Sequence, residues 1–205
     1  MVQDALMICD VCRQNKSGIT WSSGGRGTVV VCPDCGRDLE QQLDSINERL
    51  AECDDLSILV GQILSLALHF TAADMGNIQL VDADGVLRIH ASSGLSEEFL
   101  TFFSSVKESQ AACGTALANR STVVVEDVEH SDIFAGKPSL AVMLAAGARA
   151  VQSTPIITQS GRLIGVFSTH YREPRAISVQ ESRSLEFLAL RAADLIDALQ
   201  AVGRT

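Results

Sequence analysis

The chain has 205 residues, a formal net charge of −9 and an apolar fraction of 46%. This length and apolar content are enough to bury the core of one ordinary domain plus a small appendage. The acidic balance, with a neutral N-terminal segment over residues 1–38, leaves no basic surface of the kind that binds DNA or RNA. We therefore expect a globular protein that does not bind nucleic acid.

The sequence lacks the signals of membrane insertion and export. No apolar run reaches the ~20 residues that a membrane-spanning helix needs. Met1 is followed by Asp4 rather than by the basic and apolar segments of a signal peptide. Four of the six cysteines form two tight pairs, which is metal-site usage rather than a disulfide framework. We expect a cytoplasmic protein without a membrane segment.

Two CxxC pairs form the strongest motif in the chain, and nineteen residues with four glycines separate them. Two such turns can present four thiolates to one tetrahedral ion. The segment resembles a zinc ribbon. The resemblance implies a structural Zn²⁺, since four protein ligands leave no open coordination position. A rubredoxin-like iron site and a redox-switched pair of disulfides are the alternatives. The expected ligands are Cys9, Cys12, Cys32 and Cys35.

Two amphipathic stripes flank the larger part of the chain. Apolar or small residues with alternating spacings of four and three run from Leu39 to Ala67, which predicts a coiled-coil helix that breaks or is capped near Asp54 and Asp55. A similar stripe runs from Leu185 to the C-terminus. Two such helices indicate a homodimer, in which Cys53 would face its symmetry mate. The alternative is that each stripe packs against its own domain.

From Thr71 onward, the pattern predicts short strands and helices. A DADG turn and a Gln159-Ser160-Gly161 turn each join two apolar-patterned runs, which indicates two hairpins. Hairpins with helices inserted between them predict the α+β class, with a mixed but mainly antiparallel sheet covered by helices. The expected strands are 77–81, 86–91, 122–126, 148–158 and 162–171, and the expected helices are 95–103, 113–119, 140–146 and a long closing helix.

Three segments carry a family resemblance: GNIQLVDADGVLRIHASSGLSEEFLTFF, ACGTALANRSTVVVEDVEHSDIF and AVQSTPIITQSGRLIGVFSTHYREPR. In this order they resemble successive blocks of GAF domains from bacterial two-component sensor kinases. The resemblance implies a six-stranded, mainly antiparallel sheet with a pocket on one face, roofed by the elements between Leu95 and Ala146. The expected organisation is a four-cysteine module at 1–38, a connecting helix at 39–55 and a GAF domain at 56–205.

Some ligand classes and activities of GAF domains can be excluded from the residues. The Asn-Lys…Phe…Asp-Glu pattern of cyclic-nucleotide GAF domains is absent, and no Cys-His pair marks a bilin attachment site. The ACGTAL segment resembles the part of free methionine-(R)-sulfoxide reductases that carries a resolving cysteine, here Cys113. Their catalytic thiol lies in a later loop, which here reads SDIFAGKPSLAV without a cysteine. We therefore expect no enzyme activity.

Several residues are candidates for ligand contact in the implied pocket. Cys113 stands at a helix start, where it is either a redox or electrophile sensor or a small buried apolar residue. Asp127 and His130 lie in an acidic loop that can hold an amine or a second metal, or is simply solvated. Polar residues on the last two strands can fix the orientation of a ligand. The candidates are Cys113, Asp127, His130, Phe134, Gln152, Thr154 and His170.

These features predict a regulatory sensor. A ligand or redox input in the GAF pocket would shift the flanking helices, and the zinc module with its coiled coil would pass the change to a partner. Because no output domain follows Thr205, we expect action in trans on a separate histidine kinase or other regulator. The alternatives are a scaffold or dimerisation module with an empty pocket, and a thiol-based redox protein.

Overall fold

The computed structural model describes residues 6–9, 12, 14–17, 19–22, 28–37, 41, 55–104 and 111–202. The connecting helix predicted for residues 39–55, with Cys53 and the first part of the coiled-coil seam, lies outside the described residues except at positions 41 and 55. The second part of the seam is described, and Val60, Leu64 and Ala67 are buried in the core of this chain. Within the described ranges, no helix combines the length and the apolar character needed to cross a membrane.

The N-terminal module consists of two small antiparallel hairpins. Strand β1 (Leu6–Ile8) pairs with β2 (Asn15–Ser17), and β3 (Ile19–Ser22) pairs with β4 (Thr28–Val31). A helical turn at residues 33–37 follows the second hairpin. This arrangement places each CxxC pair directly after a strand.

The larger domain is built on one antiparallel sheet with the strand order β6-β5-β9-β8-β7. All four neighbouring pairs are antiparallel, as the hairpin pattern predicts. The α+β fold is therefore confirmed, although the sheet has five strands within the described residues where the family resemblance implied six. The strands are β5 (Met75–Val81), β6 (Leu87–Ser93), β7 (Val123–Val125), β8 (Ala150–Ile157) and β9 (Leu163–Tyr171).

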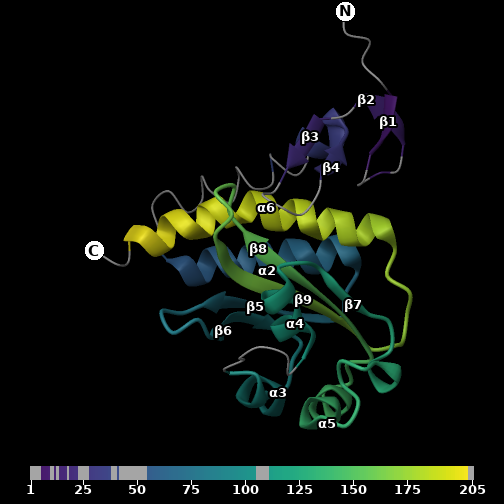
Figure 1. Cartoon of the computed structure of the whole chain (residues 1–205), viewed down its shortest axis with the longest axis vertical. Helices are drawn as coiled ribbons and strands as arrows, with labels where there is room; N and C mark the ends of the chain where they lie inside the picture. Colours follow the sequence, from purple (N-terminus) through teal and green to yellow (C-terminus); the bar gives the residue numbers. More distant parts are fainter. Residues whose placement is uncertain are drawn as a thin grey trace, which may run out of the picture.

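Helices cover both faces of this sheet (Figure 1). The two long helices lie on one face, and three short helices lie on the other. The long helices are α2 (Leu56–Thr71) and α6 (Val179–Val202), and the short ones are α3 (Glu97–Phe102), α4 (Ala112–Asn119) and α5 (Pro138–Ala145). The apolar core is accordingly divided into two clusters, one on each side of the sheet.

Both predicted hairpin turns are present. In the first, the Asp82 carboxylate accepts hydrogen bonds from the backbone N–H groups of Asp84 and Val86, each at 2.9 Å. Gly85 has a φ of +75°, which a side chain would disfavour. In the second turn, Thr158 N–H donates to the carbonyl of Arg162, and Gly161 has a φ of +86°.

The long helices begin and pack as their sequences suggest. Asp55 caps α2 by accepting a hydrogen bond from the backbone N–H of Ser57 at 2.8 Å. On α6, Leu185, Leu188 and Ala192 are fully buried within the chain itself. Packing inside the domain therefore accounts for this part of the apolar stripe without a second copy, and the homodimer stays a prediction.

The N-terminal module packs onto the helical layer. Cys9, Val31 and Cys32 are buried in the same apolar cluster as residues of α2 and α6, and β4 contacts α6. Figure 1 shows β3 and β4 beside α6, on the side away from the sheet. The module and the larger domain therefore share one core rather than two separate ones.

We expect Gly165→Ala to lower the free energy of unfolding by about 2–3 kcal/mol. Gly165 lies in β9 between β5 and β8, and a Cβ atom there would press against the carbonyl oxygen of Gln79 and lie 2.9 Å from Cδ2 of Leu80. Gly61→Ala in α2 is the control, because a Cβ there meets nothing within 4 Å and the helix gains up to ~1 kcal/mol. Urea unfolding measures both, and an unchanged midpoint for Gly165→Ala would contradict this account of the sheet.

Candidate functional site

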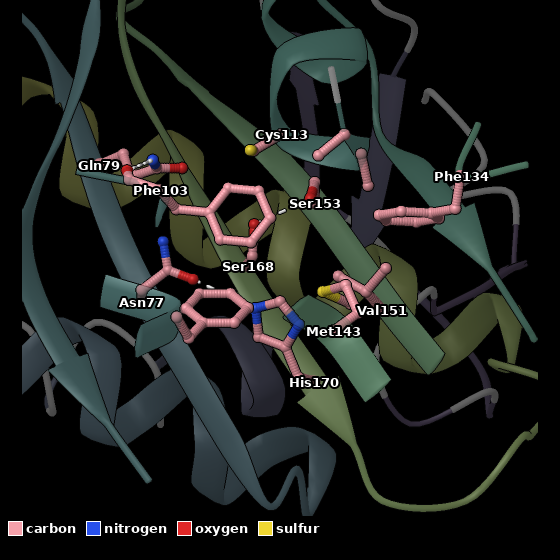
Figure 2. Close-up of a pocket in the computed structure, with 13 residues that line it drawn as sticks. Asn77, Gln79, Phe103, Cys113, Phe134, Met143, Val151, Ser153, Ser168 and His170 are labelled. Atoms are coloured by element: carbon pink, nitrogen blue, oxygen red, sulfur yellow. Dashed lines mark hydrogen bonds between the residues drawn. The ribbon is translucent and has the colours of Figure 1, made fainter. Parts of the chain in front are cut away.

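A small cavity lies between the sheet and the short helices (Figure 2). Its volume is about 20 Å³, which leaves room for about one water molecule. Strands β5, β8 and β9 form its floor, and α3, α4, α5 and the loop before α5 form its walls and roof. The lining residues are Asn77, Gln79, Phe99, Phe103, Ala111, Ala112, Cys113, Phe134, Met143, Val151, Ser153, Ser168 and His170.

The floor is polar because the strand register aligns polar residues on one face. Asn77 pairs with Ser168 across β5 and β9, and Ser168 pairs with Ser153 across β9 and β8. Since directly paired residues point to the same side of a sheet, these three side chains form one row. Gln79 and His170 lie two residues further along their strands on the same face. All five side chains are buried.

The hydrogen bonds of the floor leave two buried atoms without a partner. His170 Nε2 donates to Asn77 Oδ1 over 3.1 Å, and Gln79 Nε2 donates to the carbonyl of Phe103 over 3.3 Å. His170 Nδ1 and Gln79 Oε1 have no hydrogen-bond partner in the described part of the chain. A buried acceptor without a donor costs about 1–3 kcal/mol, so a water molecule or another donor in the cavity would stabilise these two atoms.

A hydroxyl pair completes the floor. The hydroxyl oxygens of Ser153 and Ser168 are 2.8 Å apart, so one hydroxyl donates to the other. Each of these two hydroxyls therefore has a hydrogen-bond partner, unlike His170 Nδ1 and Gln79 Oε1 beside them. Its remaining hydrogen-bonding capacity faces the cavity that both residues line.

The two titratable side chains in the described lining are both held neutral. Burial lowers the pKa of His170 to about 4, so its ring is uncharged near neutral pH. Burial also raises the pKa of the Cys113 thiol to about 11, against hydrogen bonds from the backbone N–H groups of Gly114 and Cys113 that lower it. The thiolate is the reactive form of cysteine, and therefore Cys113 is a poor nucleophile here.

The roof of the cavity is apolar and aromatic. Phe99 packs against Phe103 with ring centroids 4.5 Å apart and meets the His170 ring edge-on at 5.4 Å. Phe134 and Met143 close the other side (Figure 2). The cavity therefore combines a polar floor with an apolar cover, which is the usual character of small-molecule sites.

The structure brings Cys113, Phe134 and His170 together, and it places Gln152 and Thr154 elsewhere. Gln152 Nε2 donates to Thr154 Oγ1 over 3.1 Å, and both side chains are buried on the opposite face, which α6 covers. Successive strand residues alternate faces, so Val151 and Ser153 line the cavity in their place. The expected position of Gln152 and Thr154 was thus wrong by one residue in the face assignment.

Asp127 and His130 also lie away from the described lining. Asp127 caps the short 3₁₀ helix η1 (Val128–His130), and its carboxylate is 2.8 Å from His130 Nδ1. That hydrogen bond is the largest cause of the lowered pKa of Asp127, and Arg149 pairs with Asp127 and Glu129. The His130 side chain is 82% exposed, so these residues form a surface cap and ion-pair group. Ligand binding by any predicted residue stays a prediction.

Four polar lining residues are not among the predicted site residues: Asn77, Gln79, Ser153 and Ser168. Asn77 and Gln79 alternate with Ile78 and Leu80 in a strand that is otherwise apolar. A polar residue at every second position of a strand buried on both faces is a signal of a polar cavity. The serines give a weaker signal, since serine occurs widely on strands.

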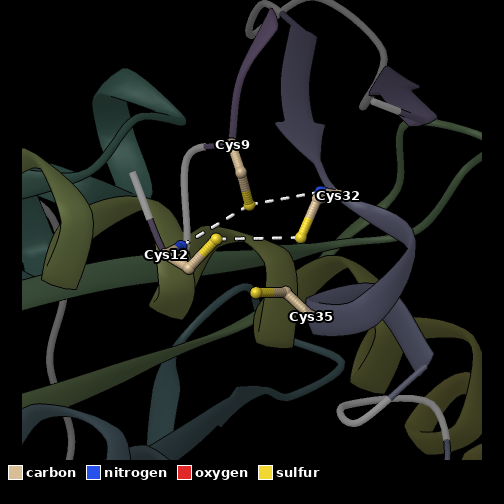
Figure 3. A group of neighbouring side chains, drawn as sticks. All are labelled: Cys9, Cys12, Cys32 and Cys35. Carbon is tan, nitrogen blue, oxygen red and sulfur yellow. Dashed lines mark hydrogen bonds between the residues drawn. The ribbon is translucent and has the colours of Figure 1, made fainter. Parts of the chain in front are cut away.

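The second candidate site is the cysteine cluster (Figure 3). The sulfurs of Cys9, Cys12, Cys32 and Cys35 all lie within 4.8 Å of one another, and those of Cys12 and Cys32 are 3.7 Å apart. A tetrahedral ion with ~2.3 Å bonds to sulfur would hold its ligands ~3.8 Å apart. The backbone N–H groups of Cys12 and Cys32 point at Cys9 Sγ, at 3.5 and 3.2 Å. The four cysteines can therefore bind a metal ion.

The crowding of four sulfurs has an electrostatic consequence. Burial, hydrogen bonds with Cys32 and Cys12, and the neighbouring charges of Cys9 and Cys12 all raise the pKa of Cys35. Several thiolates therefore cannot coexist here without a compensating cation. This is the behaviour expected of a metal-binding group.

Comparison with known proteins identifies the fold. The model of the GAF domain family matches residues 53–197. No curated protein matches the chain in sequence.

Similar solved structures agree with the family match. A domain of a putative two-component sensor histidine kinase from Sinorhizobium meliloti is 23% identical, with a TM-score of 0.58 over 69% of this chain and 90% of its own. The GAF domain region of a putative membrane protein from Geobacter sulfurreducens is 24% identical, with a TM-score of 0.60 over 74% and 99%. Free methionine-R-sulfoxide reductase from Neisseria meningitidis, in complex with its substrate, is 18% identical, with a TM-score of 0.61 over 80% and 91%. At these identities the likeness concerns the fold alone.

The buried His170 predicts a stability that falls in mild acid. Its pKa is lowered from 6.5 to about 4 on folding, so the unfolded chain takes up a proton first as the pH falls. The free energy of unfolding should therefore be about 3 kcal/mol lower at pH 4 than above pH 6.5. Urea unfolding across this range measures it. His170→Gln should remove most of that dependence, and an NMR titration giving His170 a pKa near 6.5 would contradict the prediction.

Metal binding is expected to hold the N-terminal module on the helices. The purified protein should contain about one metal ion per chain, because the four sulfurs form one closed site. Cys12→Ser should lose most of this metal, whereas Cys113→Ser, in the separate cavity, should keep it. Elemental analysis measures the content, and proteolysis after chelation should cut the module first. Equal metal content in both variants would rule out the cluster as the site.

Proposed function

Because the chain belongs to the GAF domain family, whose members are generally small-molecule-sensing and regulatory modules, we propose that it is a regulatory sensor whose cavity binds a small molecule. The observation that carries the proposal is the pair of buried acceptors, His170 Nδ1 and Gln79 Oε1, that lack partners within the described residues. Empty protein cavities are lined by apolar atoms, whereas polar lining atoms without a protein partner are typical of a cavity that holds water or a ligand. A bound ligand that donates hydrogen bonds to these two atoms would offset the free-energy cost of burying them without a partner.

We further propose that the cysteine cluster holds a structural Zn²⁺. Four thiolates in a tetrahedral arrangement suit zinc, and with all four positions filled by protein no site remains for a substrate. The sulfur spacing and the backbone N–H groups directed at Cys9 Sγ support this assignment. Iron in the same ligand set would give strong visible absorption, so a colourless protein with one zinc separates the two metals.

The layered core supports a route from the cavity to a partner. Strands β5, β8 and β9 carry cavity residues on one face and pack against the long helices with the other. The N-terminal module rests on the same helices. A ligand that shifts these strands would therefore move α2, α6 and the zinc module together. We propose that the surface formed by α2, α6 and the N-terminal module acts on a second copy of the chain or on a separate histidine kinase or other regulator.

The thiol-based alternative has less support than ligand sensing. Cys113 is only 7% exposed, and burial raises its pKa to about 11, so the reactive thiolate is scarce. In free methionine-(R)-sulfoxide reductases, which this chain resembles, the catalytic thiol lies in a loop that corresponds to residues 131–142. This loop contains no cysteine here. An enzyme of that kind would need a second thiol near the cavity.

The test is to find a ligand and to locate it in the cavity. Native mass spectrometry before and after denaturation detects a retained molecule, and a metabolite set is screened by thermal shift. Ligands should raise the melting temperature of the wild type by several degrees, since binding to the folded state alone stabilises it. The double variant Ser153→Val/Ser168→Val should abolish the shift, because it replaces both partners of one hydrogen bond with apolar groups and fills the cavity.

Thr154→Val is the matched control, since Thr154 lies on the opposite face of the same strand. This variant should retain the ligand response. If the double variant responds like the wild type, the ligand binds elsewhere. If no retained molecule and no thermal shift is found, the scaffold alternative with an empty cavity replaces the sensor.

A further inference from the structure

We propose that the cavity selects uncharged molecules that present N–H or O–H donors, of the amide or urea class, and discriminates against anions and cations of the same shape. This inference rests on the proposed function, because it names the chemistry of the ligand for the same cavity. It is carried by the direction of the hydrogen bonds on the floor and by the charge of the lining.

The floor offers acceptors where the ligand must make contact. His170 Nε2 is 3.1 Å from the Asn77 carbonyl oxygen, which can only accept, so the proton of the neutral ring resides on Nε2. His170 Nδ1 then carries no proton, and its lone pair is a hydrogen-bond acceptor. In Figure 2 it points away from Asn77, toward Met143 and the cavity. A ligand must therefore supply a donor to this atom.

The second acceptor is held in place in the same way. Gln79 Nε2 donates to the main-chain carbonyl of Phe103 over 3.3 Å. Turning the amide over would set its oxygen against that carbonyl oxygen, which is repulsive, so Oε1 stays without a partner. Gln79 is fully buried, and its Oε1 can gain a donor from a molecule in the cavity.

The charge of the site excludes ionised ligands. The described lining contains no Asp, Glu, Lys or Arg, and His170 is neutral. An anion would lose its hydration and meet two acceptors, which repel it. A cation would find acceptors but no counter-charge, and desolvation would disfavour it. An uncharged donor pays a much smaller desolvation penalty, which hydrogen bonds to the two acceptors can offset.

The remaining walls favour a flat group. Phe99, Phe103 and Phe134 present aromatic surface, and a planar amide packs well against such rings. One of the Ser153 and Ser168 hydroxyls donates to the other, and the one that accepts can donate its own proton to the carbonyl of the same amide. The volume of about 20 Å³ admits only a small fragment, for which the flexible side chain of Met143 must yield some space.

Acetamide, acetate and acetamidinium test this selectivity directly, because they share one shape and differ in charge. Each is titrated into the full-length wild-type protein at neutral pH, to about 200 mM because fragments of four heavy atoms bind weakly. Protein-observed NMR follows the Gln79 side-chain amide and the backbone amides of Cys113 and Ser153. Acetamide should bind at least about ten-fold more tightly than either ion.

Two variants check that the acceptors cause the preference. Gln79→Leu removes one acceptor at similar volume and should weaken acetamide binding several-fold. Thr154→Val, on the other face of the sheet, should leave it unchanged. The comparison of the three probes on the wild type stands even if Gln79→Leu fails to fold.

Equal or tighter binding of acetate or acetamidinium would overturn the inference and leave ligand sensing in the cavity intact. Absence of any shift with all three probes would also overturn it. The sensor proposal itself fails only if, in addition, the metabolite screen and the search for a retained molecule find nothing. The two failures are therefore distinguishable.

Discussion

The antiparallel register of β5, β9 and β8 is the constraint on which the rest of the structure depends. It aligns Asn77, Ser168 and Ser153 in one row on one face of the sheet. By the same alternation, the residues between them, such as Ile78 and Phe167, point to the other face and pack under the long helices. A shift of one residue in any of these strands would bury the polar row against apolar helices and expose apolar groups to the cavity.

This arrangement has an energetic cost that stability alone does not explain. Apolar side chains at Gln79 and His170 would bury more apolar surface and leave no orphan acceptors. A fold that keeps such groups beside a cavity is less stable than one with apolar groups there, and the proposed binding site would account for that cost. The glycine at position 165 adds to the constraint, because close contact with β5 holds the register that forms the row.

Much of the fold was predictable because its signals are local. The alternation in the strands, the turn residues around Gly85 and Gly161, and the cap at Asp55 each act within a few residues of the chain. The cysteine cluster was predictable for the same reason, since ligand spacing encodes it. The cavity was only partly predictable. Which face of β8 meets the short helices depends on pairing with β9, so the local pattern alone does not distinguish Gln152 and Thr154 from Val151 and Ser153 as lining residues.

The position of the cysteine module shows what covers part of the apolar stripe on α6. A stripe of apolar residues predicts that something covers a helix, but it does not say what. Here the sheet takes one side of the helical layer, and the module adds Cys9, Val31 and Cys32 to the same apolar cluster. Because two of these three residues belong to the cysteine cluster, the cluster and the helical layer are in direct contact. The cysteine cluster and the cavity thus lie on opposite sides of the same helices and strands, which form one continuous packed layer between them.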